Sequence, residues 1–138
     1  MITDKTFSEE EREIYQITLD LLHAIRRGQV DIYQELCSEN LTCIEPESSG
    51  NIIEGLDFHL FFLGNTKRES NYHIEIINPV IRVFQDTAYI SYTLISNQYF
   101  NDNFKLNTVF ETRIYHKEKI GNENSPPKWK MVHFHRSS

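Results

Sequence analysis

The chain has 138 residues, of which 39% are hydrophobic and 25% are charged, and its formal net charge is −6. This length suits one domain with a substantial core, so we take residues 1–138 as a single domain. An acidic chain argues against nucleic acid as a partner, because phosphate binding needs a basic surface. A membrane partner is not expected either, since no apolar run approaches the ~18 residues of a membrane span.

The start of the chain and its cysteines suggest where the protein works. Residues 1–13 are polar and acidic, so they do not form a signal peptide. Cys37 and Cys43 fit no metal-ligand spacing and lie in no disulfide-rich context. We interpret them as reduced thiols of a cytoplasmic protein and expect neither a metal nor another cofactor.

The N-terminal half of the chain predicts three helices. Ser8 and Glu11 match a capping box, and residues 1–7 before it are a candidate disordered segment. The first helix should end near Gly28, which suits the left-handed position after a helix. Its apolar stripe consists of Ile14, Ile17, Leu21 and Ile25. Two shorter helices follow: 31–37, with Ile32, Tyr33 and Leu36 inward, and 57–63, with Phe58, Phe61 and Phe62 as the buried face.

Strands make up most of the remainder. Residues 41–45 alternate like a strand, and 51–54 can return beside them after a turn. Four longer strands are predicted at 72–84, 87–100, 104–117 and 128–136. Pro79 limits the first of these to an edge, a bulge or a break. Helices followed by a strongly curved antiparallel sheet give an α+β fold. Its expected shape is a cone, in which the sheet wraps the first helix and leaves one open mouth.

Two arginines lie on the last two strands, which form a predicted hairpin. Period-two alternation gives each strand a common face, with Glu111, Arg113 and Tyr115 on one strand and Val132, Phe134 and Arg136 on the other. The opposite face of the last strand then carries Met131, His133 and His135. If the faces of Arg113 and Arg136 coincide, the two form a cationic spot inside the curved sheet. Alternatively, both are solvated surface residues, or Arg113 pairs with Glu111.

The histidines and the scattered acids give no diagnostic motif. His133 and His135 have a metal-binding spacing, but His116 is the nearest candidate third ligand, so we expect packing rather than a metal. A lone histidine such as His59 is more often a satisfied structural group than a catalyst. An enzyme would have these groups to choose from: Tyr15, Glu45, Tyr92, Tyr99 and Glu111. We predict no catalytic residues.

Several longer segments carry a resemblance to a known family. They are LTCIEPE at 41–47, EGLDFH at 54–59, INP at 77–79, ETR at 111–113 and VHFHR at 132–136. In this order they strongly resemble the association domain of calcium/calmodulin-dependent protein kinase II, also called the hub. The resemblance extends from about Glu11 to Ser137, which is nearly the whole chain.

The resemblance implies a nuclear transport factor 2-like cone and a non-catalytic oligomerisation scaffold. In that family, domains pair through the outer face of the sheet, and the dimers assemble into a closed ring that holds kinase domains at its periphery. The expected partners are therefore other copies of this chain and a kinase-bearing homologous chain. The family pocket holds a carboxylate through cationic residues, and His59, Arg113 and Arg136 match those positions. Calmodulin binding is associated with this chain only through its resemblance to the family.

Departures from the family pattern limit these expectations. A third pocket arginine is expected near Tyr92 to Ile95, where this chain is apolar, so the pocket should be less cationic. The chain has no kinase motif and no basic amphipathic calmodulin-binding helix. It is thus either a free-standing hub or an excised fragment. The alternative functions on the same fold are an isomerase- or dehydratase-type enzyme and a small-acid binding protein.

Overall fold

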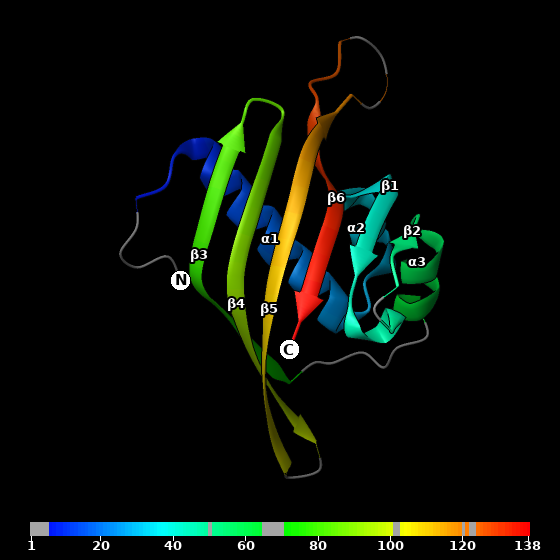
Figure 1. The fold of residues 1–138 in the computed structure, drawn as a ribbon, viewed down its shortest axis with the longest axis vertical. Helices are drawn as coiled ribbons and strands as arrows, with labels where there is room; N and C mark the ends of the chain where they lie inside the picture. The colour runs from blue at the N-terminus through cyan, green and yellow to red at the C-terminus, as the bar shows by residue number, and fades with distance from the viewer. Residues whose placement is uncertain (1–5, 50, 65–70, 101–102, 120, 122–123) are drawn as a thin grey trace.

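The structure is a computed structural model that describes residues 6–49, 51–64, 71–100, 103–119, 121 and 124–138. Its elements, in chain order, are α1 (Glu9–Arg27), α2 (Val30–Leu36), β1 (Cys37–Ile44), the short 3-10 helix η1 (Pro46–Ser48), β2 (Ile53–Glu54), α3 (Asp57–Gly64), β3 (Tyr72–Phe84), β4 (Thr87–Phe100), β5 (Asn103–Glu118) and β6 (Lys128–Ser137). The predicted α+β class is confirmed (Figure 1). The predicted turn residues 101–102 and the segment 65–70 after α3 lie outside the described residues.

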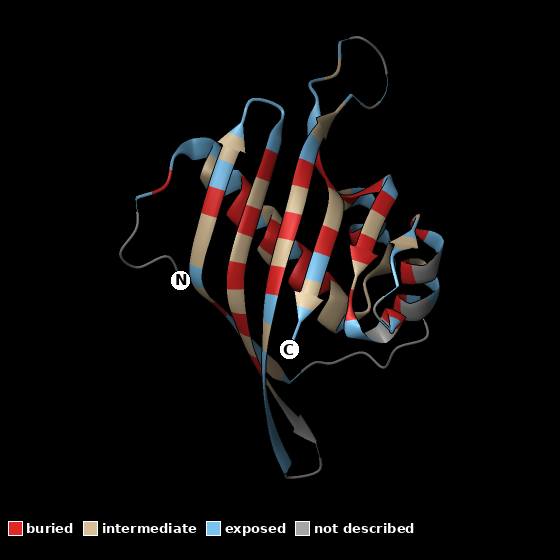
Figure 2. Cartoon of the chain, viewed as in Figure 1, coloured by how far each residue is buried: buried red, intermediate tan, exposed pale blue. Residues whose placement is uncertain are grey.

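The six strands form one curved, unclosed sheet in the order β2-β1-β6-β5-β4-β3. β1 runs parallel to β6, and every other neighbouring pair is antiparallel. α1 crosses one face of the sheet diagonally, while α2 and α3 lie at the β1–β2 end (Figure 1). Buried and less buried residues alternate along the long strands (Figure 2). This is expected when one face of the sheet packs against a helix and the other faces solvent.

α1 begins and ends where the sequence predicts. The Ser8 hydroxyl accepts from the backbone N–H of Glu11 at 3.2 Å, and the Glu11 carboxylate accepts from the backbone N–H of Ser8 at 2.8 Å. Gly28 has φ 64° and ends the helix in the left-handed conformation, which glycine adopts at little steric cost. Of the candidate disordered segment, residues 1–5 lie outside the described set and Phe7 is buried.

A buried hydrogen bond fastens α1 to the sheet. Thr18 is fully buried, and its hydroxyl donates to the carbonyl of Ile14 at 2.8 Å. The same hydroxyl lies 2.8 Å from the Tyr115 hydroxyl on β5, which therefore acts as the donor. This contact joins residues 97 positions apart and fixes the helix over the middle of the sheet.

Among the described residues, register shifts interrupt the pairs β1–β6, β3–β4 and β5–β6, and the last two bear on the predictions. Residues Asn78 and Pro79 interrupt the β3–β4 register, with Asn78 at φ 50°, so the predicted irregularity at Pro79 is confirmed. The bulge between β5 and β6 was not predicted: Tyr115 pairs with Met131, whereas Ile114 pairs with His133. The extra residue shifts the alternation, so Met131 is fully buried on the inner face. The prediction that Met131 shares a face with His133 is therefore wrong.

The two short helices orient differently from the prediction. Phe61 on α3 is 73% exposed, while His59 and Leu63 are buried, so Phe61 does not belong to the buried face. On α2, Tyr33 is buried but Ile32 is 41% exposed. Helices of eight and seven residues with apolar side chains on several sides have no single stripe that decides which one turns inward. The side chains of Phe58 and Phe62 lie outside the described set.

Candidate functional site

One pocket brings the three predicted ligand-binding residues together. Its walls come from α1, α2 and α3, from β5 and β6, and from the residue that follows β1. The wall residues are Ile25, Tyr33, Glu45, His59, Leu63, Arg113, Phe134 and Arg136. In the β5–β6 register, Arg113 is opposite Phe134 and Glu111 is opposite Arg136. The faces of the two arginines therefore coincide, as one of the sequence alternatives required.

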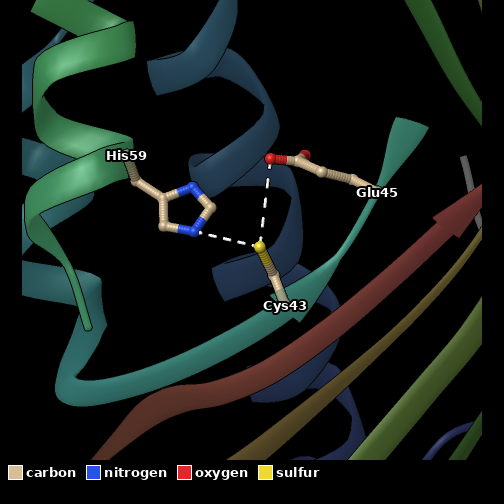
Figure 3. A group of neighbouring side chains, drawn as sticks. All are labelled: Cys43, Glu45 and His59. Carbon is tan, nitrogen blue, oxygen red and sulfur yellow. Dashed lines mark hydrogen bonds between the residues drawn. The ribbon is translucent and has the colours of Figure 1, made fainter. Parts of the chain in front are cut away.

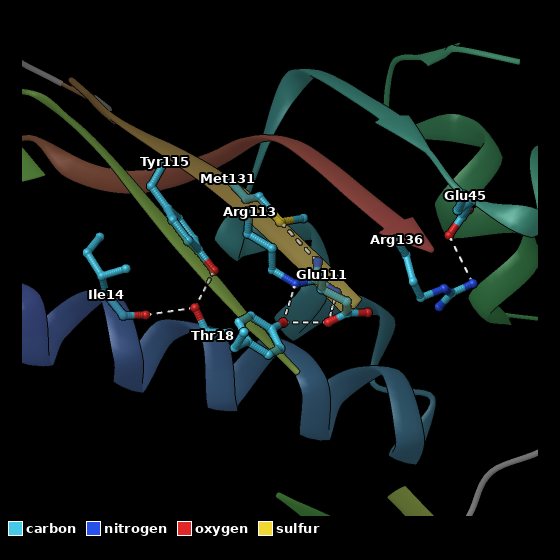
Figure 4. Close-up of polar contacts among 9 residues, drawn as sticks. Ile14, Thr18, Glu45, Glu111, Arg113, Tyr115, Met131 and Arg136 are labelled. Carbon is cyan, nitrogen blue, oxygen red and sulfur yellow. Dashed lines mark hydrogen bonds and ion pairs between the residues drawn. The ribbon is translucent and has the colours of Figure 1, made fainter. Parts of the chain in front are cut away.

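Arg113 is held from several directions in the core (Figure 4). Its side chain is only 1% exposed, and one terminal nitrogen lies 3.2 Å from the carboxylate of Glu111. Its Nε donates to the Tyr92 hydroxyl at 3.0 Å, and its other terminal nitrogen contacts the sulfur of Met131 at 3.2 Å. The guanidinium carbon lies 4.7 Å from the centre of the Phe134 ring. The alternative in which Glu111 pairs with Arg113 is thus confirmed.

The protonation states in this network follow from burial and charge. Burial disfavours the cation of Arg113, but the neighbouring Glu111 carboxylate holds the pKa of Arg113 above its ordinary value. Burial foremost raises the pKa of Tyr92, so its hydroxyl keeps its proton and donates a hydrogen bond to the Glu111 carboxylate. The result is a neutral ion pair in which the hydroxyl both accepts and donates a hydrogen bond.

Arg136 is the more accessible of the two arginines. Its terminal nitrogen lies 3.3 Å from the carboxylate of Glu45, which follows β1, and the two side chains are 23% and 9% exposed (Figure 4). Glu45 is also a wall residue of the pocket. Each pocket arginine therefore already has a carboxylate partner from the protein, which the sequence analysis considered for Arg113 but not for Arg136.

His59 contributes a neutral ring to the pocket. Burial, followed by the charges of Arg113 and Arg136, lowers its pKa from 6.5 to about 4. The imidazole lies 5.4 Å from the Phe134 ring and 6.2 Å from the Tyr33 ring, centre to centre. At neutral pH this histidine offers a hydrogen-bonding edge rather than a positive charge.

The sequence analysis missed a cluster beside the pocket that includes Cys43. The sulfur of Cys43 lies 3.1 Å from Nε2 of His59 and 3.9 Å from a carboxylate oxygen of Glu45 (Figure 3). Strand alternation places Cys43 and Glu45 on one face, which the sequence could have indicated. The approach of His59 depends on how α3 packs against β1, and no local pattern predicts it.

The remaining sequence candidates do not join the pocket. His133 contacts the Thr42 hydroxyl at 2.7 Å, and His116 lies 3.2 Å from the Thr87 hydroxyl. Within the described residues, these histidines and His135 do not form a group of metal ligands. Tyr15 is buried on α1 and is not a wall residue. The side chain of Tyr99 is outside the described set.

Comparisons with known proteins agree with this fold. The family profile of the calcium/calmodulin dependent protein kinase II association domain matches residues 10–138. The delta subunit of calcium/calmodulin-dependent protein kinase type II from Oryctolagus cuniculus is 36% identical over 141 residues. That match covers 99% of this chain and 25% of the relative, so the chain spans about a quarter of that protein's length.

Solved structures give the same result. The association domain of the kinase from C. elegans superposes with a TM-score of 0.82 at 30% identity, covering 94% of this chain and 95% of that one. The hub of the S. rosetta kinase superposes with a TM-score of 0.78 at 29% identity, covering 96% and 98%. Nuclear transport factor 2-like proteins at 18% and 20% identity also match, which shows the fold alone.

The lowered pKa of His59 predicts a pH-dependent stability. Below its unfolded pKa of 6.5 the unfolded chain binds a proton that the folded chain does not bind until about pH 4. Stability is therefore full above pH 6.5 and falls as the pH drops toward 4. Between pH 7 and pH 5 the loss should be about 2 kcal/mol. Urea denaturation at both pH values should show this loss in the wild type and a much smaller one in His59→Gln.

The control for this measurement is His73→Gln on β3, where the side chain is 65% exposed. That variant should keep the pH dependence of the wild type. If His59→Gln keeps it as well, the histidine does not titrate as the buried site requires.

Proposed function

The chain belongs to the calcium/calmodulin-dependent protein kinase II association domain family, and from this premise we propose that it is a non-catalytic oligomerisation scaffold. Copies of the chain pair into dimers, and the dimers assemble into a closed ring. A kinase-bearing homologous chain is the expected further partner, in the cytoplasm. The pocket takes a small carboxylate as its ligand.

The main observation in support of assembly is the exposed apolar end of β5. Phe104, Leu106 and Phe110 are 54%, 60% and 53% exposed. Alternation puts them on the face of β5 opposite to Glu111, which is the outer face of the sheet. Within the part of the chain that the structure describes, pairing between β5 and β6 ends at Phe110, so the earlier residues of β5 leave an open strand edge on a ribbon that protrudes from the body (Figures 1 and 2). Exposed apolar surface and an open edge favour association with another chain.

The ion pairs of the buried carboxylates support the proposal that the scaffold is non-catalytic. A general base must accept a proton from its substrate. Glu45 and Glu111 are each engaged in an ion pair with an arginine, so transfer of a substrate proton to either carboxylate would disrupt an existing contact. The distant likeness to nuclear transport factor 2-like proteins brings no residue of this chain into a catalytic role.

The two arginines differ in how they can serve a ligand. Arg113 is fully buried and already engaged, so it contributes a fixed field inside the pocket. Arg136 is partly exposed and faces the pocket, so its guanidinium can exchange the Glu45 carboxylate for that of a ligand. Binding must therefore displace or share an existing ion pair, which makes the affinity low.

Assembly is tested by multi-angle light scattering at micromolar concentration. We expect a closed particle of ~12 or ~14 subunits, because oligomers usually close into point groups. Leu106→Lys should reduce its mass, since it puts a charge into the apolar surface of the β5 ribbon. The matched control is Gln34→Lys, which adds the same charge to an exposed position of α2. A wild-type monomer would exclude the scaffold, and a plain dimer would exclude the ring.

Ligand binding is tested by calorimetric titration with a short hydroxy acid. The wild type should bind with a dissociation constant of ~0.1 to 1 mM, which is about 4 to 5.5 kcal/mol. Glu45→Gln should bind more tightly, because the amide no longer competes for Arg136. Arg136→Gln should abolish binding.

The control for the titration is Glu10→Gln. It removes a carboxylate from a surface ion pair with Lys117 and should leave the binding unchanged. Absence of heat in both the wild type and Glu45→Gln, or binding that survives Arg136→Gln, would show that the arginines serve the structure alone.

A further inference from the structure

Three potential metal ligands converge beside the pocket. Cys43, Glu45 and His59 are all buried, and one ligand atom from each lies within 4.8 Å of the others. Cys43 and Glu45 extend from β1 and the residues after it, and His59 extends from α3 toward them (Figure 3). The cluster therefore joins the edge of the sheet to the third helix and shares no residue with the ion pair Arg113–Glu111.

The spacing of the ligand atoms suits a small tetrahedral ion. Zn²⁺ binds sulfur at about 2.3 Å and imidazole nitrogen at about 2.0 Å, so neighbouring ligands of a tetrahedron lie about 3.5 Å apart. The sulfur of Cys43 lies 3.1 Å from the His59 nitrogen and 3.9 Å from the Glu45 oxygen. All three ligand atoms lie within 4.8 Å of one another, which is close to the spacing that one ion needs.

From this geometry we propose that Cys43, Glu45 and His59 form a zinc site. A thiolate, an imidazole and one carboxylate oxygen are the donor types that Zn²⁺ accepts together, whereas Mg²⁺ and Ca²⁺ prefer oxygen alone. Three protein ligands leave a fourth position open. Since Glu45 and His59 are wall residues of the pocket, water or a small anion from the pocket can fill it.

Binding of the ion requires the thiol to lose its proton. Burial foremost, and then the Glu45 carboxylate, raises the pKa of Cys43 to about 12, so the thiol is neutral without a metal. Zn²⁺ replaces that proton, which leaves to solvent, and a zinc–thiolate bond forms without any change in oxidation state. His59 is already neutral and can coordinate directly. The other charges that face the sulfur are Arg113 and Arg136, which oppose a cation and are balanced by Glu111 and Glu45.

A nucleophilic role suits the same residues less well. A reactive cysteine needs a stabilised thiolate, and the raised pKa of Cys43 disfavours one. A catalytic triad also needs the acid to orient the histidine. In a triad the acid bonds to the histidine nitrogen that does not face the nucleophile, whereas here the Glu45 carboxylate contacts the sulfur of Cys43 itself.

The site is tested by titrating the metal-free full chain with Co²⁺ and recording the optical spectrum in a non-thiol reductant. We expect one Co²⁺ per chain, a thiolate-to-cobalt charge-transfer band in the near ultraviolet and the visible bands of a tetrahedral ion. Zn²⁺ should displace the cobalt, and Mg²⁺ should not. Because one proton is released, the affinity should rise about tenfold per pH unit near neutrality.

Variants identify the ligands. Cys43→Ser should lose the charge-transfer band, and His59→Gln and Glu45→Gln should each weaken binding by at least about 100-fold. The matched control is Cys37→Ser, which changes the other buried free cysteine and should keep the band. Circular dichroism checks the folding of each variant. If Cys43→Ser does not fold, the two other ligand variants decide. A wild type without the band, a band that survives in folded Cys43→Ser, or unweakened binding in both of the other ligand variants would overturn the proposal.

Discussion

The structure depends most on the buried ion pair between Arg113 and Glu111. Moving a guanidinium from water into a protein core costs several kcal/mol unless its partners are well placed. Here the partners come from adjacent strands: Tyr92 from β4, Glu111 from β5 itself and Met131 from β6. A slip of one residue between β4 and β5 would turn Tyr92 to the outer face, so the network also selects the register of the sheet.

The same pair determines what the pocket can do. Because Arg113 is neutralised within the core, the charge available to a ligand comes from Arg136, which Glu45 holds in place. Burial foremost, and then the charges of Arg113 and Arg136, lower the pKa of His59 and keep its ring neutral. A neutral imidazole offers no charge to an anion, but it can coordinate a metal ion together with the neighbouring cysteine once that thiol has lost its proton. The proposed anion site and the proposed zinc site therefore share the Glu45 carboxylate.

The sequence predicted the features that depend on local chemistry. The capping box at Ser8, the end of α1 at Gly28 and the irregularity at Pro79 each follow from the backbone preferences of the residues involved. Alternation grouped the side chains within each strand, but whether Arg113 and Arg136 share a face was left open and was decided by the β5–β6 register. The proximity of His59 to them came from the family resemblance, since the sequence pattern of a single histidine on a short helix does not indicate its neighbours.

Features that depend on tertiary packing could not be predicted. The bulge in β6 turned Met131 inward, although simple alternation places it outward. α3 is apolar on several sides, so its sequence did not show that Phe61 would be exposed and His59 buried. The Cys43–Glu45–His59 cluster needs both the course of β1 and the docking of α3. Each of these is decided by contacts between elements rather than within one.

The central role of the buried pair is tested most directly by a double-mutant cycle on Glu111→Leu and Arg113→Met, measured as the free energy of unfolding in urea. Each single substitution should cost about 3–5 kcal/mol, because it leaves one charge buried without its partner. The double variant should be more stable than either single variant, since it buries no unpaired charge. If the two losses simply add, the pair does not organise the core and the account is wrong.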